Sequence, residues 1–323
     1  MSNYPTVIAT QHPWASDVVG GSYGHPVLAK LYETELVSNG AFEDTLVGWD
    51  GGAVRQDFGE NAMVGNYVLA MESIAYEHTY FDRTSADNGN EMNMVLVTGF
   101  IKVTVATATS KKVKVRVYTT ATTARVASPA SDYVLLTINL DNASIAYDSD
   151  NNSQWIKFYF IADMTGFAGE YVHVEILSTD YATVNYYLDD LKVYEVKEII
   201  ELDCPNSLRL KWERKTDANY EMVDGTDKDY VRDWRPIYSM DYVYCSRAEM
   251  IKHIGITESD FNFFIPQKDN LNGDFVRMIE DFSGNYFQDR FLGHNNELIL
   301  RGIYLRKFKN IEYGGTYYAL TSA

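Results

Sequence analysis

The motif that most resembles a catalytic one is a Gly-x-Ser-x-Gly pattern at residues 20–24. In α/β hydrolases this pattern places a nucleophilic serine on a sharp turn between a strand and a helix. Here His25 and Pro26 follow at once, and a proline disfavours helical geometry in the residue before it. The pattern therefore does not predict a hydrolase nucleophile.

A second pattern suggests metal binding, because Asp148, Asp150 and Asn152 match the first half of an EF-hand loop. That loop requires glycine at its sixth position and a bidentate glutamate at its twelfth. The chain has Ser153 and Tyr159 at these positions. A solvated turn is the better interpretation of this acidic run.

The histidines are scattered singly and show no spacing typical of metal ligands or of a catalytic base beside a nucleophile. The sequence also lacks a phosphate-binding glycine loop and a dinucleotide fingerprint. We therefore predict no catalytic and no cofactor-binding residue, and expect a protein that is not an enzyme. The six histidines are His12, His25, His78, His173, His253 and His294.

Composition favours strands as the elements of this chain, because its 323 residues include 25 Tyr and 15 Phe. This length predicts two domains. A formal net charge of -17 argues against binding to nucleic-acid phosphates and predicts no nucleic-acid partner. We see no apolar run of the length of about 18 residues that spans a membrane, and no secretory signal pattern. Cys204 and Cys245 are interpreted as small buried apolar residues, with a disulfide between them as the alternative.

Strand patterns begin at Leu36 and continue without a credible helix through most of the first domain. In 112–118 the valines alternate with Lys112, Lys114 and Arg116, which predicts a half-buried antiparallel strand. Several strands at this spacing indicate two packed sheets. The other predicted strands cover residues 94–105, 134–140, 155–162 and 172–177.

The fold prediction is therefore mainly β, in three parts. Residues 1–35 form an irregular arm rich in proline and glycine, 36–197 form a jelly-roll β-sandwich, and 198–323 form a smaller β-rich α+β domain. The last part contains a predicted strand at 208–212, a strand pair or one bent strand at 298–306, and a short helix. That helix begins after Ser246, which forms a capping box with Glu249, and ends at Gly255.

Two stretches bracket the predicted sandwich. Leu36 to Trp49, interpreted as the first strand, contains Asn-Gly-x-Phe-Glu followed by Gly-Trp, and the stretch from Tyr186 to Tyr194 contains Tyr-Leu-Asp-Asp-Leu-Lys-Val. This combination resembles the jelly-roll carbohydrate-binding modules attached to xylanases and other glycanases. The resemblance covers roughly residues 36–195 and concerns the fold more than the ligand.

The resemblance implies two kinds of site. A structural calcium ion in such modules joins the first strand to the last, and the matching positions are Glu43 and Asp189, with Asp190 as a possible substitute for Asp189. Alternation along the strand would turn only one of the two aspartates inward. The alternative is that these are ordinary turn and edge carboxylates.

Sugar binding in such modules uses aromatic rings that stack on pyranose faces. Aromatic side chains in sandwiches mostly pack in the core or across strands, so a structural role is the alternative for each candidate. Trp49 and Trp155 are assigned to the core. The candidates for stacking are Tyr76, Tyr80, Phe81, Tyr118, Tyr181 and Tyr186.

Two functions from different classes fit these observations. The first is a structural component of a tailed-bacteriophage virion, at the capsid surface, neck or tail, since the second domain is vaguely similar to phage structural proteins around residues 204–212. The arm and second domain would then dock on other virion proteins, in several copies or as a homo-oligomer, after assembly in the host cytoplasm. The alternative is a bacterial carbohydrate-binding surface protein with surface glycans as partners.

Overall fold

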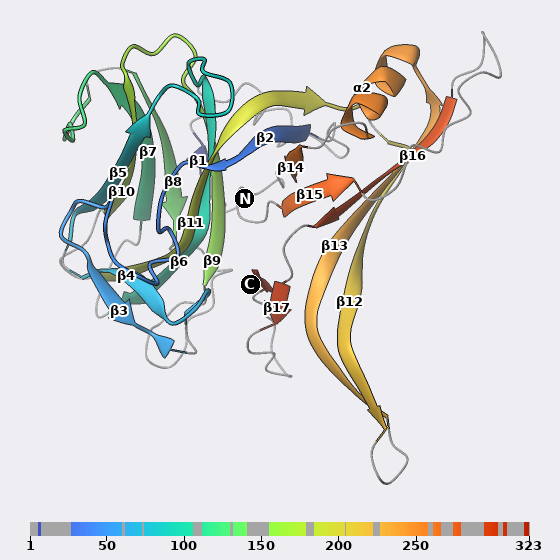
Figure 1. Cartoon of the computed structure of the whole chain (residues 1–323), viewed down its shortest axis with the longest axis horizontal. Coiled ribbons are helices and arrows are strands. Elements are labelled where there is room, and N and C mark those ends of the chain that lie inside the picture. Colours follow the sequence, from blue (N-terminus) through green and yellow to red (C-terminus); the bar gives the residue numbers. More distant parts are fainter. Residues whose placement is uncertain are drawn as a thin grey trace. The chain divides into compact units, whose positions relative to one another are not determined.

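A computed structural model gives the fold of the chain (Figure 1). It describes residues 6–7, 27–59, 62–72, 74–105, 112–129, 132–140, 155–178, 184–203, 205–221, 227–257, 261–265, 274–278, 294–302, 306–308 and 320–322. Contacts divide the chain into two compact units, built mainly from Leu31–Glu198 and from Ile199–Ile265 with Asp274–Ala323. The three predicted domain ranges themselves stay a prediction. No helix in these ranges is long and apolar enough to cross a membrane.

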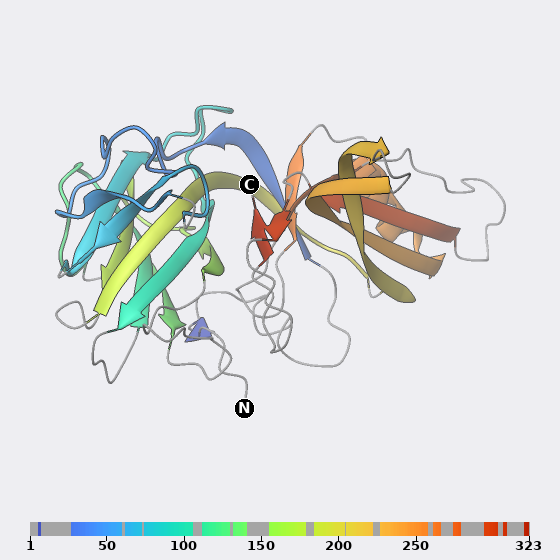
Figure 2. The ribbon, with the colours of Figure 1, turned by 90° about the horizontal axis from the view of Figure 1, so that it is seen from below.

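The first unit is a β-sandwich, as predicted (Figure 2). One sheet has the order β1-β8-β7-β10-β5. In the facing sheet β11 pairs with β6 and β4, β6 pairs with β9, and β4 pairs with β3. All of these pairings are antiparallel, and most join strands distant in the sequence, as in a jelly roll. The bounds are β1 (Thr6–Val7), β3 (Val54–Asp57), β4 (Tyr67–Met71), β5 (Tyr76–Asp82), β6 (Met94–Val105), β7 (Lys112–Thr120), β8 (Tyr133–Asn139), β9 (Ile156–Asp163), β10 (Tyr171–Ser178) and β11 (Val184–Glu201).

The core of this unit lies between the two sheets and follows from the alternation of each strand. Val113, Val115 and Val117 of β7 are buried in the core, which confirms the face predicted for these valines. Trp49 also belongs to this core, whereas Trp155 packs against a small separate cluster that contains Tyr187. Trp155 therefore packs at a smaller apolar cluster rather than in the main core.

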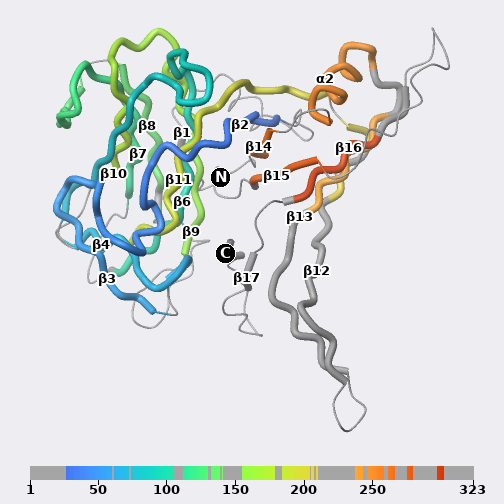
Figure 3. Tube along the Cα trace, in the orientation of Figure 1, coloured from blue at the N-terminus to red at the C-terminus, as the bar shows by residue number. Residues whose placement is uncertain are grey.

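The interpretation of residues 36–49 as the first strand is wrong. These residues form turns, and the strand before them is β2 (Val27–Glu35), in the part predicted to be an irregular arm (Figure 3). Asn39 and Phe42 have positive φ angles of 60° and 56°, which a strand does not tolerate. Gly40 lies so close to β11 that an added Cβ would be 1.7 Å from the carbonyl oxygen of Leu191. Tight packing against β11 therefore decides the shape of this segment.

The second unit has its own apolar core. It contains the hairpin β12 (Ser207–Glu221) and β13 (Asp227–Cys245), then β14 (Asn262–Ile265), β15 (Asp274–Met278), β16 (His294–Gly302), β17 (Arg306–Phe308) and β18 (Leu320–Ser322). The helix α2 (Arg247–Thr257) is capped as predicted, because Ser246 Oγ accepts the N–H of Glu249 at 3.1 Å. It ends two residues later than predicted. Residues 20–24, 141–154, Tyr181 and Cys204 lie outside the described residues, as does the side chain of Cys245.

Candidate functional site

The outward face of the five-stranded sheet carries polar and aromatic side chains, which alternate with the core residues along its strands. On β10 the register places His173 opposite Tyr80 of β5 and Tyr118 of β7. Because side chains alternate along a strand, these residues share the face that points away from the core valines. We call this surface the outward face.

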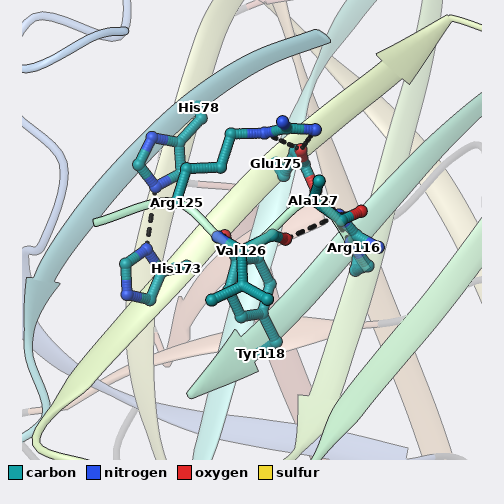
Figure 4. A network of polar contacts seen from close by, with 8 residues as sticks. All are labelled: His78, Arg116, Tyr118, Arg125, Val126, Ala127, His173 and Glu175. Atoms are coloured by element: carbon teal, nitrogen blue, oxygen red, sulfur yellow. Dashed lines mark hydrogen bonds and ion pairs between the residues drawn. The ribbon is translucent and has the colours of Figure 1, made fainter. Parts of the chain in front are cut away.

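An ion-pair cluster lies on the outward face next to these rings, as Figure 4 shows. It consists of Glu175, Arg116 and Arg125, and the carboxylate of Glu175 is fully buried. Arg116 Nε donates to Glu175 Oε2 at 2.7 Å, and Arg125 Nη2 lies 2.5 Å from Glu175 Oε1. One carboxylate therefore holds two guanidinium groups.

Residues 121–129, which we call the covering segment, lie over part of this face. Arg116 Nη2 donates to the carbonyl oxygen of Ala127 at 3.0 Å, and the N–H of Val126 donates to the hydroxyl of Tyr118 at 3.1 Å. The guanidinium carbon of Arg125 lies 3.4 Å from the ring centroid of Tyr76. These contacts bury the side chain of Tyr118. They attach the covering segment to the sheet through Arg116, Tyr118 and Tyr76.

Two histidines extend the polar contacts, since His78 Nε2 and His173 Nδ1 are 2.8 Å apart (Figure 4). His173 Nε2 is 3.1 Å from the carbonyl oxygen of Thr122, which can only accept a hydrogen bond. Nε2 of His173 also lies 2.8 Å from the hydroxyl of Thr120, which can donate or accept. A proton on Nε2 of His173 satisfies both oxygens and leaves Nδ1 to accept from Nε2 of His78. This assignment leaves Nδ1 of His78 as a buried acceptor without a partner.

Both histidines are neutral at neutral pH. Burial lowers the pKa of His78 to about 4, and the neighbouring His173 and Arg125 add to this effect. Burial also lowers the pKa of His173. The positive charge of the outward face therefore comes from arginine and lysine side chains.

The structure places the predicted stacking tyrosines in different surroundings. Tyr80 is 45% exposed, Tyr76 is half-buried beneath Arg125, and Tyr118 is covered as described. Tyr186 and Phe81 point into the sandwich, where Tyr186 is fully buried and Phe81 packs against the core. Tyr80 is therefore the one candidate among the described residues with a largely open ring.

Several residues of the outward face were missed in the sequence. Arg116 and Arg125 lie 59 and 50 residues before Glu175, so they form no short motif with it or with its neighbour His173. A signal exists in β10, where Tyr171, His173 and Glu175 alternate with Val172, Val174 and Ile176. Such alternation marks a strand with a polar outward face, but it does not identify the strands beside it.

The two predicted calcium ligands bind the same short stretch of backbone, residues 63–67. Asp189 Oδ2 accepts the N–H groups of Met63 at 2.7 Å and Val64 at 3.0 Å, and its Oδ1 accepts the N–H of Asp190 at 2.7 Å. Asp189 is fully buried. Burial raises its pKa to about 7, although these N–H bonds oppose the shift.

Glu43 binds the other end of that stretch. Its Oε1 accepts the N–H groups of Asn66 at 3.0 Å and Tyr67 at 2.9 Å. Gly65 lies between them with a φ of 60°, and an added Cβ would be 2.1 Å from the carboxyl carbon of Glu43. Position 65 therefore requires glycine. We call Glu43, Asp189 and residues 63–67 together the carboxylate clamp.

The sequence predicted that only one of Asp189 and Asp190 would point inward, and this prediction is wrong. Both are buried, because a bulge between Asp189 and Lys192 interrupts the alternation of β11. Asp190 has a φ of 48° and forms an ion pair with Lys192 at 2.8 Å. It therefore has a partner of its own and does not substitute for Asp189 in the clamp.

The clamp fits a calcium ion only in part. Calcium takes about six to eight oxygen ligands, of which two carboxylates supply some. Among the described residues, no group of three or more His, Cys, Asp or Glu side chains is placed to hold a metal. Three carboxylate oxygens of the clamp already accept N–H bonds. Calcium binding therefore stays a prediction.

Comparison with known proteins gives structural likenesses alone. No family model and no curated protein matches the chain. The CBM22-1 xylan-binding domain of Paenibacillus barcinonensis Xyn10C is 20% identical, with a TM-score of 0.33, over 51% of this chain and 96% of that domain. The C-terminal family 22 carbohydrate-binding module of Clostridium thermocellum Xyn10B is 14% identical, with a TM-score of 0.33, over 52% and 97%.

A tandem of two such domains covers more of the chain. The CBM22-1-CBM22-2 tandem of Paenibacillus barcinonensis Xyn10C covers 88% of this chain and 86% of its own length, at 15% identity and a TM-score of 0.33. Likenesses at this level do not identify a ligand, so the proposals below rest on the side chains of this chain.

Proposed function

We propose that the protein is a non-enzymatic carbohydrate-binding protein whose outward face holds a glycan. The observation that carries this proposal is the open ring of Tyr80, 45% exposed on a sheet face that also carries buried polar groups. Tyr171 contacts this ring edge-on, with centroids 6.2 Å apart, which helps to fix its orientation. A fixed and exposed ring beside hydrogen-bonding groups is what a pyranose ring requires.

The surroundings of Tyr80 support recognition of hydroxyl groups. The rings of His78 and His173 lie 6.1 and 5.9 Å from that of Tyr80, centroid to centroid. The covering segment approaches these rings at Thr122, whose carbonyl oxygen lies 3.1 Å from His173 Nε2, and it places the guanidinium group of Arg125 over Tyr76 on the same face of β5. A glycan that extends from Tyr80 along β5 would therefore meet the donors of Arg125.

The virion hypothesis remains a prediction, because none of the contacts described above supports it. Its docking arm falls mostly on residues outside the described part, and no comparison bears on a phage particle. The proposed glycan binding is compatible with a location on a virion or on a bacterial surface. The absence of enzymatic activity also remains a prediction.

A Tyr80→Ala variant tests the proposed function. We expect a loss of about 1–2 kcal/mol of binding free energy, or about five- to thirtyfold in affinity, because the stacking surface is removed. A glycan array would select a soluble ligand, and isothermal titration calorimetry would then measure its affinity for both proteins.

Tyr32→Ala is the matched control for this measurement. Tyr32 is an aromatic residue of β2, where its hydroxyl accepts a hydrogen bond from Asn88, so its removal should leave glycan affinity unchanged. Binding of no glycan at all, or equal affinity in the Tyr80→Ala variant, would contradict the proposal.

A further inference from the structure

Arg125 is the second cation on a carboxylate that already has one. Arg116 binds Glu175 through both Nε and Nη2 and also donates to two carbonyl groups of the covering segment. Its side chain is 10% exposed, whereas that of Arg125 is 19% exposed. If Arg125 turned to another acid, Glu175 would still be paired with Arg116.

Arg125 also keeps donor capacity free. Its Nε and Nη2 bind Glu175, and its guanidinium plane covers Tyr76. Within the part of the chain that the structure describes, its Nη1 has no hydrogen-bond or ion-pair partner. Arginine presents its donors as a rigid fork, which matches the two oxygens of a carboxylate.

The charges on the outward face favour an anion. Arg116 and Arg125 outnumber Glu175, and the register places Lys114 of β7 on the same face. The register also places Asp82 of β5 on this face, beside Tyr80, and Asp50 is exposed at the edge of β5 next to His78. The excess of positive charge therefore lies around Arg125, at the end of the face away from Asp82, in a chain whose net charge is -17.

We propose that the glycan bound at the outward face is acidic, and that Arg125 binds the carboxylate of a uronic-acid residue while another ring of the same glycan stacks on Tyr80. This inference rests on the proposed glycan binding and specifies its ligand class. The excess positive charge and the free donor of Arg125 distinguish a uronic acid from a neutral sugar, which offers hydroxyl groups alone.

The test compares each uronic-acid polymer with the same polymer after chemical reduction of its carboxyl groups. Glucuronoxylan, galacturonan and mannuronan fragments are used, and affinities for the full chain are measured by titration calorimetry at fixed ionic strength. We expect at least one acidic form to bind about tenfold more tightly than its reduced form. This ratio should fall to about one in Arg125→Gln and take an intermediate value in Arg125→Lys, which keeps the charge but loses the fork.

Arg209→Gln is the matched control, because it removes the same charge from an exposed position in the second unit. It should leave the ratio unchanged, and unfolding curves would confirm that each variant is folded. Equal binding of acidic and reduced polymers, or a preference that survives Arg125→Gln, would overturn this inference. If the reduced polymers then still bound in a Tyr80-dependent way, the proposed function itself would stand.

Discussion

Two carboxylates of the first unit, both without exposed surface, have partners that differ in kind. Asp189, in the carboxylate clamp, accepts three backbone N–H bonds and has no cationic partner in the described part of the chain. Glu175, on the outward face, is paired with two guanidinium groups. Both side chains have no exposed surface. The two sites thus show two ways of holding an acid away from water.

The difference between these sites has consequences for function. The N–H groups of the clamp belong to a fixed stretch of backbone and cannot change partners. Without a ligand, the clamp therefore serves to join residues 63–67 to β11. The raised pKa of Asp189 shows that these dipoles do not fully offset the burial of a charge. A guanidinium group at the end of a side chain can instead change partners. The outward face is therefore the better candidate for binding, and the clamp for stability.

Glu175→Gln should have the largest effect on stability among the variants that probe this contrast. It leaves two partly buried guanidinium groups without their acid, and breaking a buried ion pair from one side costs about 3–5 kcal/mol. Urea denaturation followed by tryptophan fluorescence would measure the loss. Arg125→Gln should cost less than about 1 kcal/mol, because Arg116 still pairs with Glu175. Equal losses in Arg125→Gln and Arg116→Gln would contradict the role of Arg125 as the exchangeable partner.

Asp189→Ala should have the next largest effect. It leaves three N–H donors without an acceptor, and each unsatisfied buried donor costs about 1 kcal/mol or more, so we expect a loss of about 2–4 kcal/mol. Glu43→Ala is the matched control within the clamp. Its N–H partners lie nearer to water, which can replace the carboxylate, and the expected loss is about 1 kcal/mol. A larger loss for Glu43→Ala than for Asp189→Ala would reverse our ranking of the two acids.

The pH dependence of stability tests calcium at the clamp directly. The pKa of Asp189 is raised to about 7 from the value of 3.8 expected when unfolded, so between these values the folded state binds more protons. The free energy of unfolding should therefore fall as pH rises from about 4 to 7, and Asp189→Asn should remove this part of the slope.

Calcium would reverse that sign, because a metal ion requires the ionised carboxylate and its binding strengthens as pH rises. Thermal unfolding of the native chain, with calcium and then with excess chelator, decides between the two. A midpoint at pH 7 that does not change on chelation would count against calcium at the clamp. A midpoint that falls on chelation in the native chain, but not in Asp189→Asn, would support it.

The sequence by itself determined the sandwich, several of its strands and the capped helix. These features depend on local signals, such as the alternation of valines in β7 and the Ser246 cap, which act through neighbouring residues. The resemblance to carbohydrate-binding modules, rather than any local signal, pointed to Glu43 and Asp189 as a pair and to Tyr80 among the candidate rings. Only the tertiary structure decided that residues 36–49 are not a strand, since close packing against β11 requires their turns. The tertiary structure alone also brought Arg116, Arg125 and Glu175 together. The pairing of β7 with β10 joins residues about sixty positions apart, and no local pattern specifies which strands become neighbours.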